Sequence, residues 1–342
     1  MTVTHIKPSS IVLLTTLRCT AACDNCCFGC TPEQGRTMTL DEMKGYVDMC
    51  LEAYPDTISV LDITGGECML LGKDIDRIFT YAGSKGLKCY MVSNAFWATS
   101  YDKAYATLKR LKQCGLSKAS FSTGEDHNQY VPWTNVRNAS VAAARLGIDS
   151  ELRIERRYGC MDIAQELEKD REITELKNQG KLKFSISPWM QYSKVNRTRN
   201  IKAKFVESDK KESCRSLFKN VVINPYGEVY ACCGIGVCHI PQMRLGNVFK
   251  EPVKVIYERA FEDFLKVWLF VDGPEAVLKY VHKKTGQKFS WHTTHLCDIC
   301  RTIFMDRSIL PVIRDNFYDA AYLPLLSYDT IAKCENESRT KR

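Results

Sequence analysis

The stretch Arg18-Cys19-Thr20-Ala21-Ala22-Cys23-Asp24-Asn25-Cys26 places three thiols near the start of the chain with the spacing C-x3-C-x2-C. Iron–sulfur clusters normally take four cysteine thiolates. This spacing provides three, and it would leave one iron of a [4Fe-4S] cluster open. The stretch therefore predicts a cluster that performs chemistry at its open iron, with Cys19, Cys23 and Cys26 as ligands. Cys27 and Cys30 overlap this motif but are not interpreted as ligands, and their roles stay open.

A second motif, Thr64-Gly65-Gly66-Glu67, follows an apolar run. Together the two motifs resemble the radical S-adenosylmethionine (SAM) superfamily over about residues 10–200. The resemblance implies that the open iron chelates the amino acid end of SAM and that SAM is cleaved to a 5′-deoxyadenosyl radical. Gly65 and Gly66 would let the backbone approach SAM closely, and Glu67 would accept a hydrogen bond from its ammonium group. A structural zinc site is the alternative for the cysteines.

The composition is that of a soluble globular protein, with 342 residues, 45% hydrophobic and 26% charged. This length suits one large α/β domain with a smaller attachment. No apolar run approaches the ~18 residues of a membrane span, and the first seven residues lack the blocks of a signal peptide. We therefore expect a cytoplasmic protein that does not enter membranes.

The cysteine content and the distribution of charge limit which cofactors and partners this protein is expected to have. Seventeen cysteines without an export signal favour metal clusters in a reducing compartment over disulfides. The net charge of +8 comes from lysines and arginines spread along the chain. Because no basic face with interleaved aromatic residues appears, we expect no nucleic-acid partner.

Short β-rich runs alternate with amphipathic stretches after the cysteine motif, which indicates parallel βα units. Six such repeats predict a partial (β/α)6 TIM-like barrel. The expected strands are Ile11–Thr16, Ile58–Ile63, Lys88–Val92, Ala119–Ser122, Ser150–Glu155 and Lys183–Ser187. The expected helices are Leu40–Glu52, Asp74–Ser84, Ala104–Cys114, Asn135–Leu146 and Ile163–Asn178.

Catalytic and ligand-binding residues of a parallel barrel lie at the carboxyl ends of its strands. Five polar residues at or near such ends are predicted to contact the methionyl carboxylate or ribose of SAM. They are Ser93, Asn94, Ser122, Arg153 and Glu155. For Arg153 and Glu155, a strand with one wet face is an equally simple explanation.

A second cysteine-rich unit begins at Cys214. A hairpin over residues 224–230 leads into Cys232 and Cys233, and Cys297 and Cys300 form a later C-x2-C pair. Cys214, Cys232, Cys297 and Cys300 could complete a second, four-thiolate cluster, and a zinc tetrahedron is the alternative. The unit is similar to the SPASM or twitch appendage of radical SAM enzymes that modify peptides. Its predicted helices cover Glu251–Phe270 and Glu275–Lys283.

These patterns predict four segments. Residues 1–190 form the radical SAM barrel, 191–213 a linker, 214–305 the cysteine-rich domain with its auxiliary [4Fe-4S] cluster, and 306–342 a C-terminal helical segment with a tail.

Cys233 stands beside a proposed ligand but is not needed as one. A thiol beside a cluster and near the barrel mouth could donate a hydrogen atom to a carbon radical. The alternatives are that Cys233 is a buried spare thiol or that Cys238 is the donor.

Five segments in matching order resemble the YydG-type radical SAM peptide epimerases: residues 23–28, 64–67, 93–97, 227–233 and 296–300. In that family the first of the paired cysteines ligates the auxiliary cluster and the second returns a hydrogen atom to the substrate Cα, which here implies Cys232 and Cys233. Ala95 stands where the family usually has Gly, and Gly124 where an acidic residue is frequent.

The resemblance implies an enzyme that converts an L-residue of a ribosomally made (RiPP) precursor peptide to a D-residue. Its partners would be the peptide, SAM and a flavodoxin- or ferredoxin-type reductant. The alternatives are a maturase that forms thioether or carbon–carbon cross-links, and a non-catalytic iron–sulfur or zinc protein.

Overall fold

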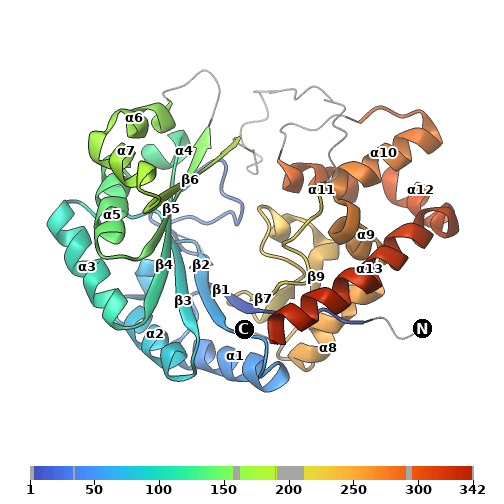
Figure 1. Ribbon diagram of the computed structural model, residues 1–342, viewed down its shortest axis with the longest axis horizontal. Helices are drawn as coiled ribbons and strands as arrows, with labels where there is room; N and C mark the ends of the chain where they lie inside the picture. Colours follow the sequence, from blue (N-terminus) through green and yellow to red (C-terminus); the bar gives the residue numbers. More distant parts are fainter. Residues whose placement is uncertain are drawn as a thin grey trace.

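A nine-stranded sheet lies at the centre of the computed structural model (Figure 1), which describes residues 4–33, 35–156, 162–188, 190, 212–289 and 295–340. The strand order is β6-β5-β4-β3-β2-β1-β7-β8-β9. The strands are β1 (Ser10–Thr16), β2 (Val60–Gly65), β3 (Lys88–Ser93), β4 (Leu116–Thr123), β5 (Asp149–Arg156), β6 (Leu182–Pro188), β7 (Asn220–Ile223), β8 (Glu228–Tyr230) and β9 (Arg244–Asn247).

Strands β1 to β6 pair in parallel, each with the next along the chain. Figure 1 shows the sheet curving, with helices against its outer side. They are α1 (Leu40–Ala53), α2 (Asp74–Ser84), α3 (Tyr101–Gln113), α5 (Trp133–Arg145), α6 (Ile163–Lys169) and α7 (Arg171–Asn178), while the short helices η1 (Cys68–Leu71) and α4 (Glu125–Asn128) follow the ends of β2 and β4. The predicted partial barrel is confirmed.

Two predicted helices are each divided by an aspartate. The prediction of one helix over Ile163–Asn178 is wrong, because Asp170 ends α6 and its side chain caps α7 by accepting the Ile173 N–H at 3.0 Å. The stretch Glu251–Phe270 likewise divides at Asp263, which caps the second helix through the Leu265 N–H at 3.0 Å. Aspartate favours such caps because its carboxylate satisfies an orphan N–H.

The cysteine-rich unit continues the barrel sheet. Strand β7 pairs in parallel with β1, so that Asn220 lies opposite Ser10. The predicted hairpin joins β7 to β8, where the Asn224 side chain accepts the Tyr226 and Glu228 N–H groups and Gly227 adopts a φ of 74°. The two units thus share one sheet.

Helices follow this sheet to the C-terminus. They are η2 (Val237–His239), η3 (Pro241–Met243), α8 (Val253–Glu258), η4 (Arg259–Glu262), α9 (Phe264–Asp272), α10 (Pro274–Thr285), α11 (Leu296–Met305), α12 (Ile309–Asp315) and α13 (Phe317–Thr340). Figure 1 shows α13 running along α9. The Tyr328 hydroxyl donates to the Thr4 carbonyl at 2.9 Å, which joins the two ends of the described chain.

The segment boundaries stay predictions, because nearly all of the linker 191–213 lies outside the described residues. Within the described part of the chain, no helix has both the length and the apolar content to cross a bilayer.

Candidate functional site: two groups of cysteines at the barrel mouth

The three-cysteine loop follows β1 at the carboxyl-end edge of the sheet. Backbone hydrogen bonds shape it, from Cys19 N–H to the Thr31 carbonyl at 3.0 Å and from Cys26 N–H to the Cys23 carbonyl at 3.1 Å. The thiols of Cys19, Cys23 and Cys26 are only partly buried. A ligand could therefore reach all three.

Cys30 lies against one of the predicted ligands. Its backbone N–H donates to Cys26 Sγ at 3.3 Å, and its thiol lowers the pKa of the Cys26 thiol to about 6. Burial raises the pKa of Cys19 to about 11. The structure thus gives Cys30, whose role the sequence left open, a contact that stabilises the Cys26 thiolate.

The glycine pair packs against the start of this loop. A Cβ on Gly66 would lie 1.9 Å from the Arg18 carbonyl oxygen, and Gly65 adopts a φ of 125°. The Gly66 N–H donates to the Thr16 carbonyl at 2.7 Å and the Glu67 N–H to the Arg18 carbonyl at 2.9 Å. The glycines therefore allow the turn after β2 to pack closely against the backbone at Thr16 and Arg18. Their contact with SAM stays a prediction.

Glu67 joins the ends of β2 and β3. Its buried carboxylate accepts the Met69 N–H at 3.0 Å, the Ser93 hydroxyl at 2.8 Å and the Asn94 N–H at 2.7 Å, and burial raises its pKa to about 7. Ser93 also accepts the Trp97 indole N–H at 3.0 Å. Glu67 and Ser93 thus contact each other, and their contact with SAM stays a prediction.

Asn94 extends from this junction to the cluster loop, with Nδ2 3.5 Å from Cys19 Sγ and 3.0 Å from Thr20 Oγ1. The next residue, Ala95, adopts a φ of 60°. A left-handed conformation costs a residue with a Cβ about 1 kcal/mol. Ala95 thus holds a conformation that glycine would adopt without this cost.

A second line of contacts joins β5 to the cluster loop. Glu155 Oε1 accepts the Asp126 N–H at 3.0 Å, and Asp126 Oδ2 accepts the Asn25 N–H at 3.1 Å. Glu155 thereby supports the loop that carries Cys23 and Cys26. Its predicted contact with SAM stays a prediction.

Gly124 leaves the space that Glu155 occupies. A Cβ there would lie 2.1 Å from Glu155 Cγ, and the φ of 150° is one that L-residues rarely adopt. Gly124→Ala should therefore lower the free energy of unfolding by more than about 1 kcal/mol, measured by chemical denaturation. Gly45→Ala is the matched control, because a Cβ in α1 meets nothing within 4 Å and should stabilise the helix by about 0.5–1 kcal/mol. Equal stability of the two variants would contradict this packing.

His127 lies 3.6 Å from Glu155 Oε2. Burial alone would lower its pKa, but Glu155, Cys26 and Asp126 raise it above 6.5. The stabilisation from this pair should be complete below about pH 6.5 and disappear as the pH rises through the raised pKa. We expect NMR titration to find the His127 pKa above 6.5 and to find it lowered in Glu155→Gln, which keeps the acceptor for Asp126 N–H. An unchanged His127 pKa in that variant would refute the pairing.

Ser122 and Arg153 lie opposite each other on β4 and β5. The Arg153 guanidinium donates twice to Glu151 Oε2, at 3.2 Å, and its side chain is 46% exposed. Both residues remain accessible for the predicted contacts with SAM.

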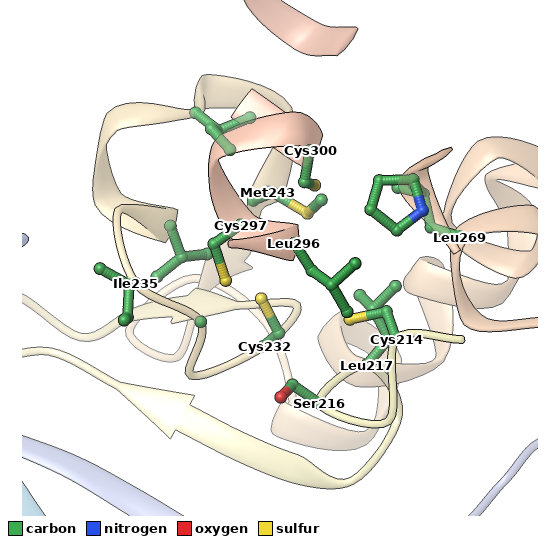
Figure 2. A pocket seen from close by; sticks show the side chains of 14 residues that line it. Cys214, Ser216, Leu217, Cys232, Ile235, Met243, Leu269, Leu296, Cys297 and Cys300 are labelled. Atoms are coloured by element: carbon green, nitrogen blue, oxygen red, sulfur yellow. The ribbon is translucent and has the colours of Figure 1, made fainter. Parts of the chain in front are cut away.

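The second group of cysteines lines one cavity (Figure 2). Cys214 precedes β7, Cys232 follows β8, and Cys297 and Cys300 lie in the first turns of α11. Apolar side chains such as Leu217, Met243 and Leu269 complete the lining. The structure thus brings together all four predicted ligands of the auxiliary cluster.

The cavity fits a cluster in its donor set and its shape. A Cβ on Gly234 would meet Cys297 Sγ at 3.2 Å and Cys232 Sγ at 3.3 Å, so glycine leaves the space between two sulfurs open. Burial raises the pKa of all four thiols. Among the described residues, no three His, Cys, Asp or Glu side chains converge on a single-ion site. A [4Fe-4S] cluster is wider than a single metal ion, and each of its four irons takes one cysteine thiolate.

Cys233 differs from its buried neighbour Cys232 in being exposed. Its sulfur accepts a hydrogen bond from Asn220 Nδ2 at 3.1 Å, and Asn220 Oδ1 accepts the Ser10 hydroxyl. Desolvation of the sulfur by the protein around it raises the pKa of the Cys233 thiol, and the negative charge of Asp62 raises this pKa further. The accessible thiol is thus held by a buried amide.

Sequence reasoning missed Asn220 and Asp62. Asp62 lies within β2 between Leu61 and Ile63, and its Oδ1 is buried without a hydrogen-bond partner. Burial raises its pKa to about 6. For Asp62, the sequence did contain a signal, because a carboxylate between apolar residues of a predicted strand is unusual. Asn220 gave no such signal, because its contact with Ser10 depends on the pairing of β7 with β1.

Cys238, the alternative hydrogen donor, lies in η2. The Tyr230 hydroxyl lies against its thiol, and burial raises its pKa to about 11. It does not line the four-cysteine cavity.

Comparisons with known proteins define the class. The family model for the SPASM domain, described as an iron–sulfur cluster-binding domain, matches residues 214–301. The solved structure of native anSMEcpe with bound AdoMet is similar with a TM-score of 0.55 and 13% identity, over 94% of this chain and 99% of that chain. The comparisons therefore support the predicted resemblance to radical SAM proteins that carry a C-terminal SPASM domain.

A particular relative is YydG of Bacillus subtilis (strain 168), whose name assigns it provisionally to peptide biosynthesis. The two are 22% identical over 301 residues, which cover 84% of this chain and 89% of YydG. The comparisons confirm the predicted resemblance and fold class, and they support a SAM-binding [4Fe-4S] cluster with a second auxiliary cluster.

Proposed function

We propose that this protein is a radical SAM peptide epimerase that converts an L-residue of a RiPP precursor to the D-form, in the cytoplasm. The observation that carries the proposal is the position of Cys233, an exposed thiol held by Asn220 and adjacent to Cys232 in the auxiliary cavity. The similarity to a protein named for peptide biosynthesis supports a peptide substrate.

In this proposal, the three-cysteine loop generates the radical, and Cys233 returns a hydrogen atom. Cys19, Cys23 and Cys26 would hold the cluster that binds SAM, and the bound cofactors supply a 5′-deoxyadenosyl radical that removes the substrate Cα hydrogen. Arg153 and Ser122 would contact SAM from the strand ends. Glu67, Asn94 and Glu155 hold the loops around the three cysteines in place.

Cys233 would complete the inversion. Its S–H bond breaks homolytically, and the hydrogen atom bonds to Cα on the face opposite to the abstraction. The sulfur is left with an unpaired electron. One electron from a flavodoxin- or ferredoxin-type reductant and one proton from solvent restore the thiol. Inversion follows because the hydrogen leaves from one face and returns to the other.

Product mass separates this function from cross-linking. The probe is a synthetic peptide encoded by a short reading frame beside the gene, incubated with reconstituted enzyme, SAM and reductant. Epimerisation in ordinary water should leave the peptide mass unchanged and alter its retention on a chiral column. A product lighter by two hydrogens would instead establish a cross-link and refute epimerisation.

Metal analysis tests the auxiliary site. The anaerobic protein should contain about eight irons per chain, and Cys297→Ser/Cys300→Ser should lose about four of them and the matching sulfide. Fe and sulfide at this site exclude the zinc alternative. One zinc per chain that disappears in the same variant would overturn the auxiliary cluster.

A further inference from the structure

We propose that Asn94 tunes the reduction potential of the three-cysteine cluster by donating an N–H···S hydrogen bond to Cys19. The inference rests on the cluster of the proposed function. It does not depend on what the enzyme does to its peptide.

The contacts of Asn94 fix the direction of its amide. Asn94 Oδ1 accepts the Phe96 backbone N–H at 3.1 Å. A backbone N–H is always a donor, so the opposite side of the amide must be the NH2 group. That group lies 3.5 Å from Cys19 Sγ and 3.0 Å from Thr20 Oγ1. The orientation is thus determined by a contact that is independent of the cysteine.

The rest of Asn94 is held as firmly. Its backbone N–H donates to Glu67 Oε2 at 2.7 Å, and the residue is 6% exposed. Because Glu67 is fully buried and also accepts from Met69 and Ser93, the turn after β3 cannot shift without breaking several bonds. The amide is therefore preorganised toward the cysteine.

A hydrogen bond to a ligating sulfur matters to the potential because it stabilises the more negative, reduced cluster. Hydrogen bonds to the sulfurs and solvent exposure are two of the factors that set the reduction potentials of iron–sulfur clusters. Groups that hydrogen-bond to the ligands of a metal also tune metal sites in general. Cys26 accepts a comparable bond from the Cys30 backbone, which no substitution of a side chain removes. The bond to Cys19 comes from a side chain and can be removed.

The expected consequence concerns the reductant. With the Asn94 bond in place, the cluster accepts an electron from a flavodoxin- or ferredoxin-type donor more readily. Without it, the potential becomes more negative, so reduction by a biological donor should fail before reduction by a strong chemical reductant does. The amide of Asn94, which the sequence assigned to SAM, then has its function at the cysteine.

The test is an EPR-monitored redox titration of the reconstituted full-length protein without SAM. Asn94→Ala should keep the wild-type iron content and shift the midpoint potential of the three-cysteine cluster to a more negative value. The auxiliary cluster in the same sample should not shift. Asn138→Ala is the matched control, because the Asn138 amide donates to the Ala98 carbonyl at 3.1 Å, away from the cysteines. The three-cysteine cluster of this variant should have the wild-type midpoint potential.

Wild-type potential in iron-replete Asn94→Ala overturns the proposal. If Asn94→Ala loses iron, Asn94→Leu decides, because leucine keeps the branched shape of the side chain and has no donor. Its midpoint should move to a more negative value, whereas the wild-type midpoint in iron-replete Asn94→Leu overturns the proposal. A wild-type protein without a reducible iron–sulfur signal would instead overturn the proposed function, which distinguishes the two failures.

Discussion

Cys233→Ala should keep the iron of both sites and still form 5′-deoxyadenosine, yet produce no D-residue. Abstraction of the Cα hydrogen precedes its return, so loss of the returning thiol leaves SAM cleavage intact. Cys233 lies beyond the four cysteines that line the auxiliary cavity, and its exposed side chain makes substitution tolerable. The effect on inversion should be complete, because alanine has no S–H bond from which the hydrogen could return.

Three measurements on one sample check this result: iron content, 5′-deoxyadenosine by chromatography, and chiral amino acid analysis of the hydrolysed peptide. Cys238→Ala is the matched control and should invert its peptide as wild type does. If Cys233→Ala still yields the D-residue at the wild-type rate, Cys233 is a spare thiol. Loss of inversion in Cys238→Ala alone would make Cys238 the donor.

Joint replacement of Cys19, Cys23 and Cys26 by Ala should remove about four irons and abolish 5′-deoxyadenosine formation. The three thiols share one loop that Gly66, Asp126 and Asn94 hold in place through backbone and side-chain hydrogen bonds. A second trio with the same spacing, Cys23, Cys27 and Cys30, overlaps the first in this loop and loses Cys23 in the same variant. Without the thiolates, no site remains where SAM could be reduced.

The control for this variant is Cys27→Ala. Cys27 adjoins Cys26 but is not one of the three predicted ligands, so its removal should leave iron content and SAM cleavage at wild-type values. Loss of iron in Cys27→Ala, or SAM cleavage that survives the triple replacement, would show that the spacing selects other ligands.

Local patterns were enough to predict the barrel and both cysteine groups. The strand-ending motifs lie at one edge of the sheet because parallel strands share their carboxyl-end edge, and every predicted barrel strand is present. The four auxiliary cysteines meet in one cavity, as hairpin and C-x2-C patterns indicated. In each case the signal lay in neighbouring residues.

Contacts between distant residues could not be predicted in the same way. The pairing of β7 with β1 brings Asn220 to Ser10, which lies 210 residues away in the sequence. The sequence predicted that Glu67 accepts a hydrogen bond from SAM, but it could not show that Ser93 and Asn94 donate to the Glu67 carboxylate. A buried carboxylate reveals its partners only when the fold supplies them.

The most direct test of the central claim is the wild-type reaction in D2O, followed by hydrolysis, chiral separation and mass spectrometry. The Cys233 thiol exchanges with solvent, whereas the abstracted hydrogen leaves with 5′-deoxyadenosine. The account predicts a D-residue that carries one deuterium on Cα. A D-residue without deuterium, or a peptide that has lost two hydrogens and contains no D-residue, would contradict it.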